Sequence, residues 1–251
     1  MIRFDNVTKR FGSKTVLDGI SYEIADKEVF CIVGPSGTGK SVSLKLMIRL
    51  LSPTSGTVSI GDEDIGAADA EDLPRIRSRF GYLFQSAALL AWMSVFENVA
   101  LPLREKTKLP ESEVRDRVMD ALEKVGLAND ANAYPSDISG GMQKRAGLAR
   151  AIVTRPEILL YDEPTSGLDP VTSRKIDELI VDLNSRLGTT SVVVTHDLHS
   201  ALAISNRIAM LKAGRIVAIQ TPAEFIKSED AEIKAFLDAQ FITKKGSWET
   251  A

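Results

Sequence analysis

One eight-residue segment limits the possible folds of this chain more than any other feature. It reads Gly34-Pro-Ser-Gly-Thr-Gly-Lys-Ser41 and fits the pattern G-x-x-x-x-G-K-[ST]. The apolar run Val29–Val33 precedes it, and 40–51 follows with leucine and methionine at helical spacing. An uninterrupted apolar run is typical of a strand buried on both faces of a parallel sheet. The order of strand, glycine-rich loop and helix therefore predicts an α/β fold with a phosphate-binding loop.

The residue types in this loop suit the binding of a nucleotide's phosphates. Glycines allow backbone N–H groups to turn towards phosphate oxygens, and the helix that follows adds its positive N-terminal end. Lys40 is expected to reach the β- and γ-phosphates, and the Ser41 hydroxyl to bind Mg²⁺. We expect Lys40 to be exposed in the empty loop, so that its removal costs little stability. The predicted phosphate-site residues are Gly34, Pro35, Ser36, Gly37, Thr38, Gly39, Lys40, Ser41 and Val42.

Two adjacent carboxylates follow a second apolar strand, predicted at 158–161. Phosphoryl-transfer sites place a carboxylate at such a strand end to hold Mg²⁺, and Asp162 suits this role through a bridging water. Glu163 is the next residue, and it can act as general base towards an attacking water.

The remaining patterns divide the chain into an α/β core, a helical insert and a tail. The core is predicted at 1–86 and 156–222, the helical insert at 87–155, and a helical tail at 223–251, all within one domain, 1–251. Turns are expected at 11–13 and at Asp18-Gly19. In the tail, apolar residues recur at helical spacing, and this helix is expected to pack either on its own core or on a partner. Those residues are Ile233, Phe236, Leu237 and Phe241.

Composition excludes several classes of protein. The chain has 31 Lys and Arg against 34 Asp and Glu, so it carries no basic excess for binding nucleic acid. Its single cysteine, Cys31, cannot form an internal disulfide and fits a reducing compartment. The apolar runs are strand-sized, and the start of the chain does not resemble a secretory signal. We therefore expect a cytosolic chain that reaches any membrane through a partner.

The segment Ile138-Ser-Gly-Gly-Met-Gln-Lys-Arg145 resembles the signature motif of ATP-binding cassette (ABC) proteins. The resemblance extends over the chain to about residue 222, and it implies a mixed, mainly parallel sheet with an antiparallel β subdomain and an inserted helical subdomain. It also implies ATP and Mg²⁺ as ligands. The family's remaining positions are matched by Gln85 of the Q-loop, Asp169 of the D-loop, the switch histidine His196, and Phe11 and Val16 beside adenine.

The resemblance also assigns roles to these positions. Gln85 is implied to contact Mg²⁺ and the attacking water and to face a transmembrane partner, while His196 contacts the γ-phosphate. The catalytic set is then Glu163, His196, Gln85 and Lys40, and the Mg²⁺ ligands are Ser41, Gln85 and, through water, Asp162.

The signature residues are implied to complete a neighbour's site. Ser139, Gly140, Gly141 and Met142 open a helix whose N–H groups can bind the γ-phosphate of ATP held by the opposite subunit. The implied partners are a second copy of this chain, forming a homodimer on ATP binding, and a transmembrane permease.

Departures from the common signature resemble one subfamily. Ile138 and Met142 replace the usual Leu and Gln, and with the segments 84–90, 93–99 and 101–103 they resemble ATPases of Mla/Mce-type lipid transporters. This implies phospholipid transport from the cytoplasmic face of the bacterial inner membrane, with a small companion protein and a lipid-binding Mce-type protein as further partners. The alternatives are the ATPase of a solute importer, for example for amino acids, and a non-transport ABC ATPase acting on DNA or ribosomes. The latter is disfavoured by the charge balance and by the single cassette.

Overall fold

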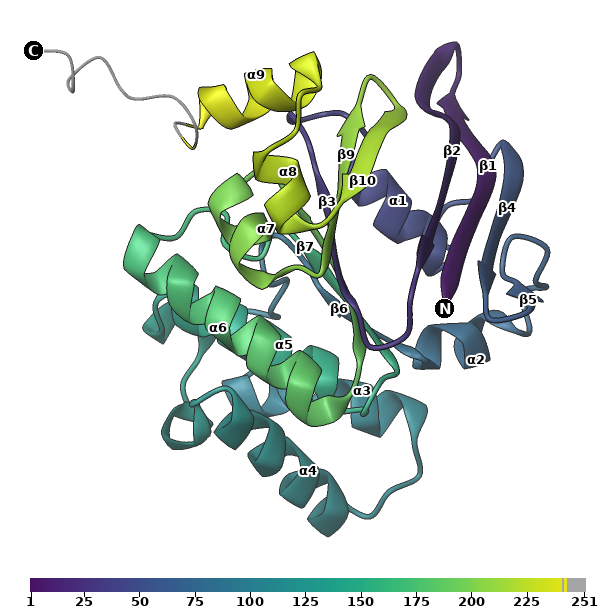
Figure 1. Ribbon diagram of the computed structural model, residues 1–251. Coiled ribbons are helices and arrows are strands. Elements are labelled where there is room, and N and C mark those ends of the chain that lie inside the picture. Colours follow the sequence, from purple (N-terminus) through teal and green to yellow (C-terminus); the bar gives the residue numbers. More distant parts are fainter. Residues whose placement is uncertain (241, 243–251) are drawn as a thin grey trace, which may run out of the picture. The chain divides into compact units, whose positions relative to one another are not determined.

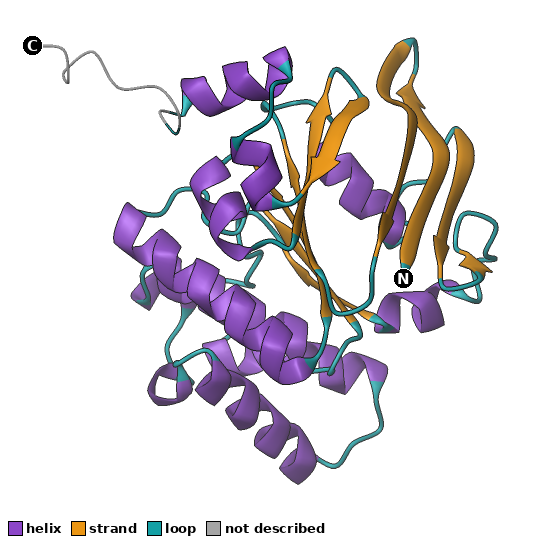
Figure 2. Ribbon diagram, in the orientation of Figure 1, coloured by secondary structure: helices purple, strands orange, loops and turns teal. Residues whose placement is uncertain are grey.

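The computed structural model describes residues 1–240 and 242, so the predicted tail residue Phe241 lies outside the described part. The chain forms two compact units, Met1–Ala70 with Val192–Ala251 and Glu71–Ser191. Figure 1 labels their elements, and Figure 2 distinguishes their helices from their strands.

The first unit contains an antiparallel sheet with the strand order β2-β1-β4-β5. In β1 the side chains of Ile2, Phe4 and Val7 are buried, and the alternation shifts by one residue at Asn6, which has a positive φ. Phe4 stacks on Tyr22 with ring centroids 4.5 Å apart. The turn predicted at Asp18-Gly19 is wrong, because both residues lie inside β2. Gly19 instead has φ of 61° at an irregularity in the β1–β2 register. The strands are β1 (Ile2–Phe11), β2 (Lys14–Ile24), β4 (Ser55–Ile60) and β5 (Glu63–Asp64).

A second sheet in this unit has the order β10-β9-β3-β8. β3 pairs parallel with β9, and β9 antiparallel with β10. Every residue of β3 is buried, including Cys31, as its apolar sequence predicts. The strands are β3 (Val29–Val33), β8 (Thr190–Thr195), β9 (Arg207–Lys212) and β10 (Arg215–Gln220). Of β8, the residues from Val192 onward belong to this unit.

In its described residues, the same unit has four helices. The first, α1, ends at Met47 rather than at Leu51 as predicted, because Arg49 takes a positive φ of 54°. The tail helix α9 buries Ile233 and Leu237 completely, so in the described residues it packs on its own chain. The helices are α1 (Lys40–Met47), α7 (Leu198–Ile204), α8 (Pro222–Ile226) and α9 (Ala231–Ala239).

The second unit is mainly helical. Its strands β6 (Phe80–Leu83) and β7 (Ile158–Asp162) pair in parallel, and α5 packs on β6. At Gly81 a Cβ atom would lie 2.2 Å from the carbonyl oxygen of Ala151, so only glycine permits this approach. The helices are α2 (Leu73–Ser78), α3 (Val95–Lys106), α4 (Glu111–Lys124), α5 (Gly140–Ile152) and α6 (Pro170–Leu187), with 3₁₀ turns at Ala128–Asp130 and Pro135–Asp137.

Local sequence explains where these helices begin. Ser94 and Glu97 form a reciprocal capping box at the start of α3. In α4, Val114, Val118 and Leu122 recur at helical spacing and are buried, as is Val125 at the end of this helix. Over the described residues, we find no helix with both the length and the apolar character needed to cross a membrane.

Candidate active site

The glycine-rich loop lies between β3 and α1 in the first unit. Gly34 has φ of 153°, and a Cβ atom there would be 2.1 Å from the carbonyl oxygen of Leu211. Gly39 immediately precedes α1 with φ of 102°. Pro35, Ser36 and Gly37 are exposed. The glycines therefore allow a tight loop whose crest is accessible to solvent at a helix N-terminus.

Lys40 is not exposed, which contradicts the prediction from the sequence. The residue is only 5% accessible, and its ammonium donates to the carbonyls of Gly34 at 2.8 Å and Pro35 at 3.1 Å. Charged donors form strong hydrogen bonds, so the lysine helps to hold the loop together.

Two residues expected beside adenine lie in the same unit as this loop. Phe11 is 46% exposed, with the ammonium of Lys9 5.0 Å from the centre of its ring. Val16 is half-buried next to the loop, since a Cβ atom at Gly39 would lie 3.0 Å from its Cγ1. An exposed aromatic face and a nearby apolar side chain suit a planar base.

His196 is exposed and follows β8 directly. The loop it belongs to is bonded to the end of α9 by Gln240, whose amide nitrogen donates to the His196 carbonyl at 2.6 Å. The amide oxygen of Gln240 accepts from the Leu198 N–H at 2.8 Å. Asp197 caps α7 by accepting from two backbone N–H groups. These contacts fix the backbone from which the histidine projects.

In the second unit, Asp162 and Glu163 are both buried at the end of β7. The Tyr82 hydroxyl donates to Asp162 at 3.2 Å. Burial, together with the negative charge of Asp162 and its hydrogen bond, raises the pKa of Tyr82, so the phenol stays a donor at neutral pH.

Glu163 has an unusual backbone, with a positive φ of 49°. Its carbonyl accepts from the Ser166 N–H at 3.2 Å and from the Lys144 ammonium at 3.1 Å. Left-handed conformations of non-glycine residues cost free energy and persist where surrounding contacts hold them, often at functional sites.

Gln85 is exposed just beyond β6. Its amide donates to the Ser166 hydroxyl at 3.4 Å, which links it to the segment that follows Glu163. Its carbonyl accepts from Lys144. The structure thus brings Gln85, Ser166 and Glu163 together within the second unit.

The predicted signature residues begin α5. Ser139 is the N-cap and accepts from the Met142 N–H at 3.3 Å, and both Ser139 and Gly140 are exposed. Gly141 packs against α6, where a Cβ atom would lie 2.5 Å from Cγ2 of Thr172. An exposed helix N-terminus of this kind can bind an anion.

Asp169 caps α6 in the same way. Its carboxylate accepts from the N–H groups of Val171 and Thr172, each at 3.0 Å. Hydrogen bonding from Thr172 in particular lowers the pKa of Asp169.

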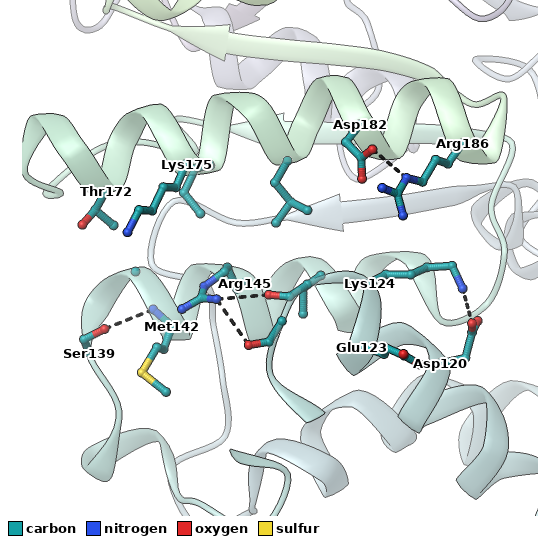
Figure 3. Close-up of a pocket in the computed structure, with 15 residues that line it drawn as sticks. Asp120, Glu123, Lys124, Ser139, Met142, Arg145, Thr172, Lys175, Asp182 and Arg186 are labelled. Carbon is teal, nitrogen blue, oxygen red and sulfur yellow. Dashed lines mark hydrogen bonds and ion pairs between the residues drawn. The ribbon is translucent and has the colours of Figure 1, made fainter. Parts of the chain in front are cut away.

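A groove of about 870 Å³ extends from the signature residues between α4, α5 and α6 (Figure 3). Its walls carry the ion pairs Lys124–Asp120 and Arg186–Asp182, and the guanidinium of Arg145 donates to the carbonyl of Val125. The paired charges leave no strong excess of either sign along the groove.

Comparison with known proteins settles the family. The model of the ABC transporter family matches residues 17–166, which include the phosphate loop, the signature segment and both carboxylates. The chain belongs to the ABC transporter family. It is an ABC ATPase, the ATP-binding subunit of a transporter, and the predicted fold class is confirmed.

Several relatives of this ABC ATPase have names that mention different substrates. A probable ribonucleotide transport ATP-binding protein mkl of Mycobacterium leprae is 43% identical over 96% of this chain and 70% of its own. The intermembrane phospholipid transport system ATP-binding protein MlaF of Haemophilus influenzae is 38% identical over 96% and 91%. A methionine import ATP-binding protein MetN of Geobacillus kaustophilus is 42% identical over 86% and 64%.

A solved structure supports the same assignment. It is a dimeric, post-hydrolysis state of the ATP-binding cassette MJ0796 bound to ADP and Pi. It is 36% identical, covers 88% of this chain and 99% of its own, and has a TM-score of 0.81.

The sequence did not predict the contacts made by Tyr82, Lys144 and Gln240. Tyr82 and Gln240 lie outside every motif recognised in the sequence, and Lys144 lies within the signature segment but has no role assigned from the sequence. The signal for Lys144 was weak, because a lysine between Gln143 and Arg145 in a helix resembles an ordinary surface residue.

Proposed function

We propose that this ABC ATPase powers the transport of lipid, in particular phospholipid, between bacterial membranes. The similarity to MlaF carries this proposal, because it extends over nearly the full length of both chains. Met142 at the fifth signature position and the segment that follows Gln85 also resemble the ATPases of Mla/Mce-type lipid transporters. The alternative is solute import, which the similarity to the methionine importer MetN supports over a shorter part of this chain.

In the proposed reaction the phosphate loop binds the phosphates of ATP, and Phe11 and Val16 contact the adenine. Lys40 turns to the β- and γ-phosphates, His196 contacts the γ-phosphate, and Glu163 accepts a proton from the attacking water. Positioning provides most of the rate enhancement in phosphoryl transfer, so the held backbones of Glu163 and His196 support this assignment.

The residues expected to hold Mg²⁺ offer donors that this cation prefers. They are the hydroxyl of Ser41, the amide oxygen of Gln85 and, through water, the carboxylate of Asp162, all of them oxygen ligands. Asp162 is buried and accepts from a neutral phenol, which keeps its position fixed. When bound, the ion would neutralise charge on the phosphates.

We infer that two copies form the active enzyme. Ser139 and Gly140 are exposed at the start of α5, and a second chain's ATP would complete its phosphate contacts there. The dimeric state of the similar cassette MJ0796 supports this arrangement.

A permease is the proposed membrane partner, holding the ATPase at the cytoplasmic face of the inner membrane. The segment around Gln85 has two exposed aromatic side chains, Phe84 at 38% and Trp92 at 74%. Exposed aromatic side chains are enriched where proteins associate. A small companion protein and a lipid-binding Mce-type protein are further proposed partners.

Reconstitution of the ATPase with its permease in liposomes tests the substrate. We expect ATP-dependent transfer of a fluorescent phospholipid and no uptake of labelled methionine, with the Glu163→Gln variant inactive in both assays. Methionine uptake without lipid transfer would favour the importer.

A further inference from the structure

Lys144 is a buried cation whose role the proposed reaction leaves open. It lies in the second turn of α5 and is 5% accessible. Its hydrogen bonds go to two main-chain carbonyls, those of Gln85 and Glu163. Removing an ammonium from water is costly, and an apolar residue of similar length would fill this position at lower cost. The contacts of this lysine therefore call for an explanation beyond packing.

The contact with Glu163 acts on a strained backbone. The residue holds a positive φ of 49°, and its carbonyl has two donors, the Ser166 N–H and the Lys144 ammonium at 3.1 Å. The direction of the Glu163 side chain depends on this backbone conformation. A donor that fixes the carbonyl consequently fixes where the carboxylate projects.

The contact with Gln85 belongs to a longer attachment between α5 and the Q-loop. Further along the same helix, Arg150 donates to the carbonyls of Ala87 at 2.6 Å and Ala88 at 2.7 Å. These two alanines also have positive φ, 59° and 49°. The signature helix therefore fixes the backbone of the Q-loop at both ends of the segment 85–88.

Two opposing effects act on the pKa of Lys144, and burial is the larger of them. Burial lowers the pKa of Lys144, while the negative charges of Glu163 and Asp162 raise it. The lysine is thus near both acidic residues, while its own hydrogen bonds go to the carbonyls of Gln85 and Glu163.

We propose that Lys144 is a positioning residue that fixes Gln85 and Glu163 in one geometry and links both to the signature helix. The inference rests on the catalytic roles proposed above for those two residues. A displacement of the Q-loop would then also shift the general base, Glu163, because the Lys144 ammonium is bonded to both segments.

The test compares Lys144→Met, Lys144→Gln and Lys144→Arg in the full chain, with Glu163→Gln as the reference for loss of the base. Lys124→Met is the matched control, since Lys124 lies in the same unit but pairs with Asp120. We expect Lys144→Met to lower kcat by about 10- to 100-fold with KM for ATP unchanged, because a small misplacement of a catalytic group has effects of this size. The Gln and Arg variants keep N–H donors and should recover part of the lost rate, while the control stays within twofold of wild type.

Several outcomes would overturn the inference. One is a folded Lys144→Met variant with wild-type kcat. Another is a variant whose melting temperature falls together with kcat, with neither property recovered by Lys144→Gln or Lys144→Arg. If the Met variant does not fold, Lys144→Gln decides alone, because full activity without the charge would contradict the proposal. If Glu163→Gln remains active, the assignment of the base fails first, which separates the two failures.

Discussion

Lys40 is almost completely buried in a loop with an exposed crest, and its ammonium donates to two carbonyls of that loop. A lysine so placed has two roles in our proposal, since it stabilises the loop and also binds phosphate. The sequence indicates only the second role. The motif defines which residues are expected to bind a nucleotide, but it does not show which hydrogen bonds stabilise the loop without one.

We predict that Lys40→Ala abolishes ATP turnover and also lowers the free energy of unfolding by about 1.5–3 kcal/mol, the range for a hydrogen bond to a charged group. Steady-state hydrolysis and chemical denaturation measure the two effects. Ser36→Ala, on the exposed crest, serves as control for stability. Turnover near the wild-type rate would refute the assignment of the phosphate loop.

For Glu163→Gln we predict retained ATP binding and a loss of turnover of about 10²–10⁴-fold, as for the removal of a general base. The amide has the size of the carboxylate but cannot accept the proton, so ATP-bound dimers should accumulate on size exclusion. Glu157→Gln in the same unit is the control, since Glu157 is surface-exposed and pairs with Arg79. Hydrolysis as fast as in the wild type would show that Glu163 is not the base.

At the scale of elements, the sequence predicts strands and helices with strong periodicity and misses those with weak signals. The buried run of β3 and the tail helix α9 are found where expected. The strands β9 and β10 are missed, because β10 is only half-buried and their hairpin turn, Ala213-Gly214, resembles an ordinary loop. Asp18-Gly19 is mistaken for a turn because a glycine with positive φ serves equally well in a β-irregularity.

The site shows the same division. Its motifs, together with the resemblance to the family, indicate the residues that we propose to bind ATP. The residues that hold them in place, such as Tyr82 and Gln240, come from distant parts of the chain and carry no local pattern.

The helix α9 provides a prediction at this scale. It ends next to Gln240, whose amide bonds both the carbonyl of His196 and the N–H of Leu198. We expect Gln240→Ala to lower kcat several-fold with ATP affinity unchanged, because His196 loses a fixed backbone. Isothermal titration and steady-state kinetics would separate the two, and Gln240→Glu, which keeps only the acceptor, should fall between. Unchanged kcat in both variants would contradict this role for α9.

For the whole molecule, the central expectation is that each active site is shared by two chains. Ser139→Arg should block the exposed start of α5, and Lys40→Ala should remove phosphate binding, so each variant alone is inactive. Mixed together, they form some dimers with one intact site, made of Lys40 from one chain and Ser139 from the other. We therefore predict partial recovery of ATP hydrolysis on mixing.

The mixing experiment has an internal control. Adding Glu163→Gln to the chain that keeps Lys40 places the missing base in the one restored site and should abolish the recovery. No recovery in the first mixture, with both variants folded, would contradict a shared site.

The burial of Cys31 in β3 has a practical consequence for following such dimers. Thiol reagents attack accessible thiolates, and the only cysteine of this chain is buried in its core. The natural chain is therefore an unreactive background for maleimide labelling. One cysteine introduced at an exposed position such as Ser136, close to the signature residues in sequence, would carry a single fluorophore per chain. Energy transfer between labelled chains could then time their approach and separation during each cycle of ATP hydrolysis.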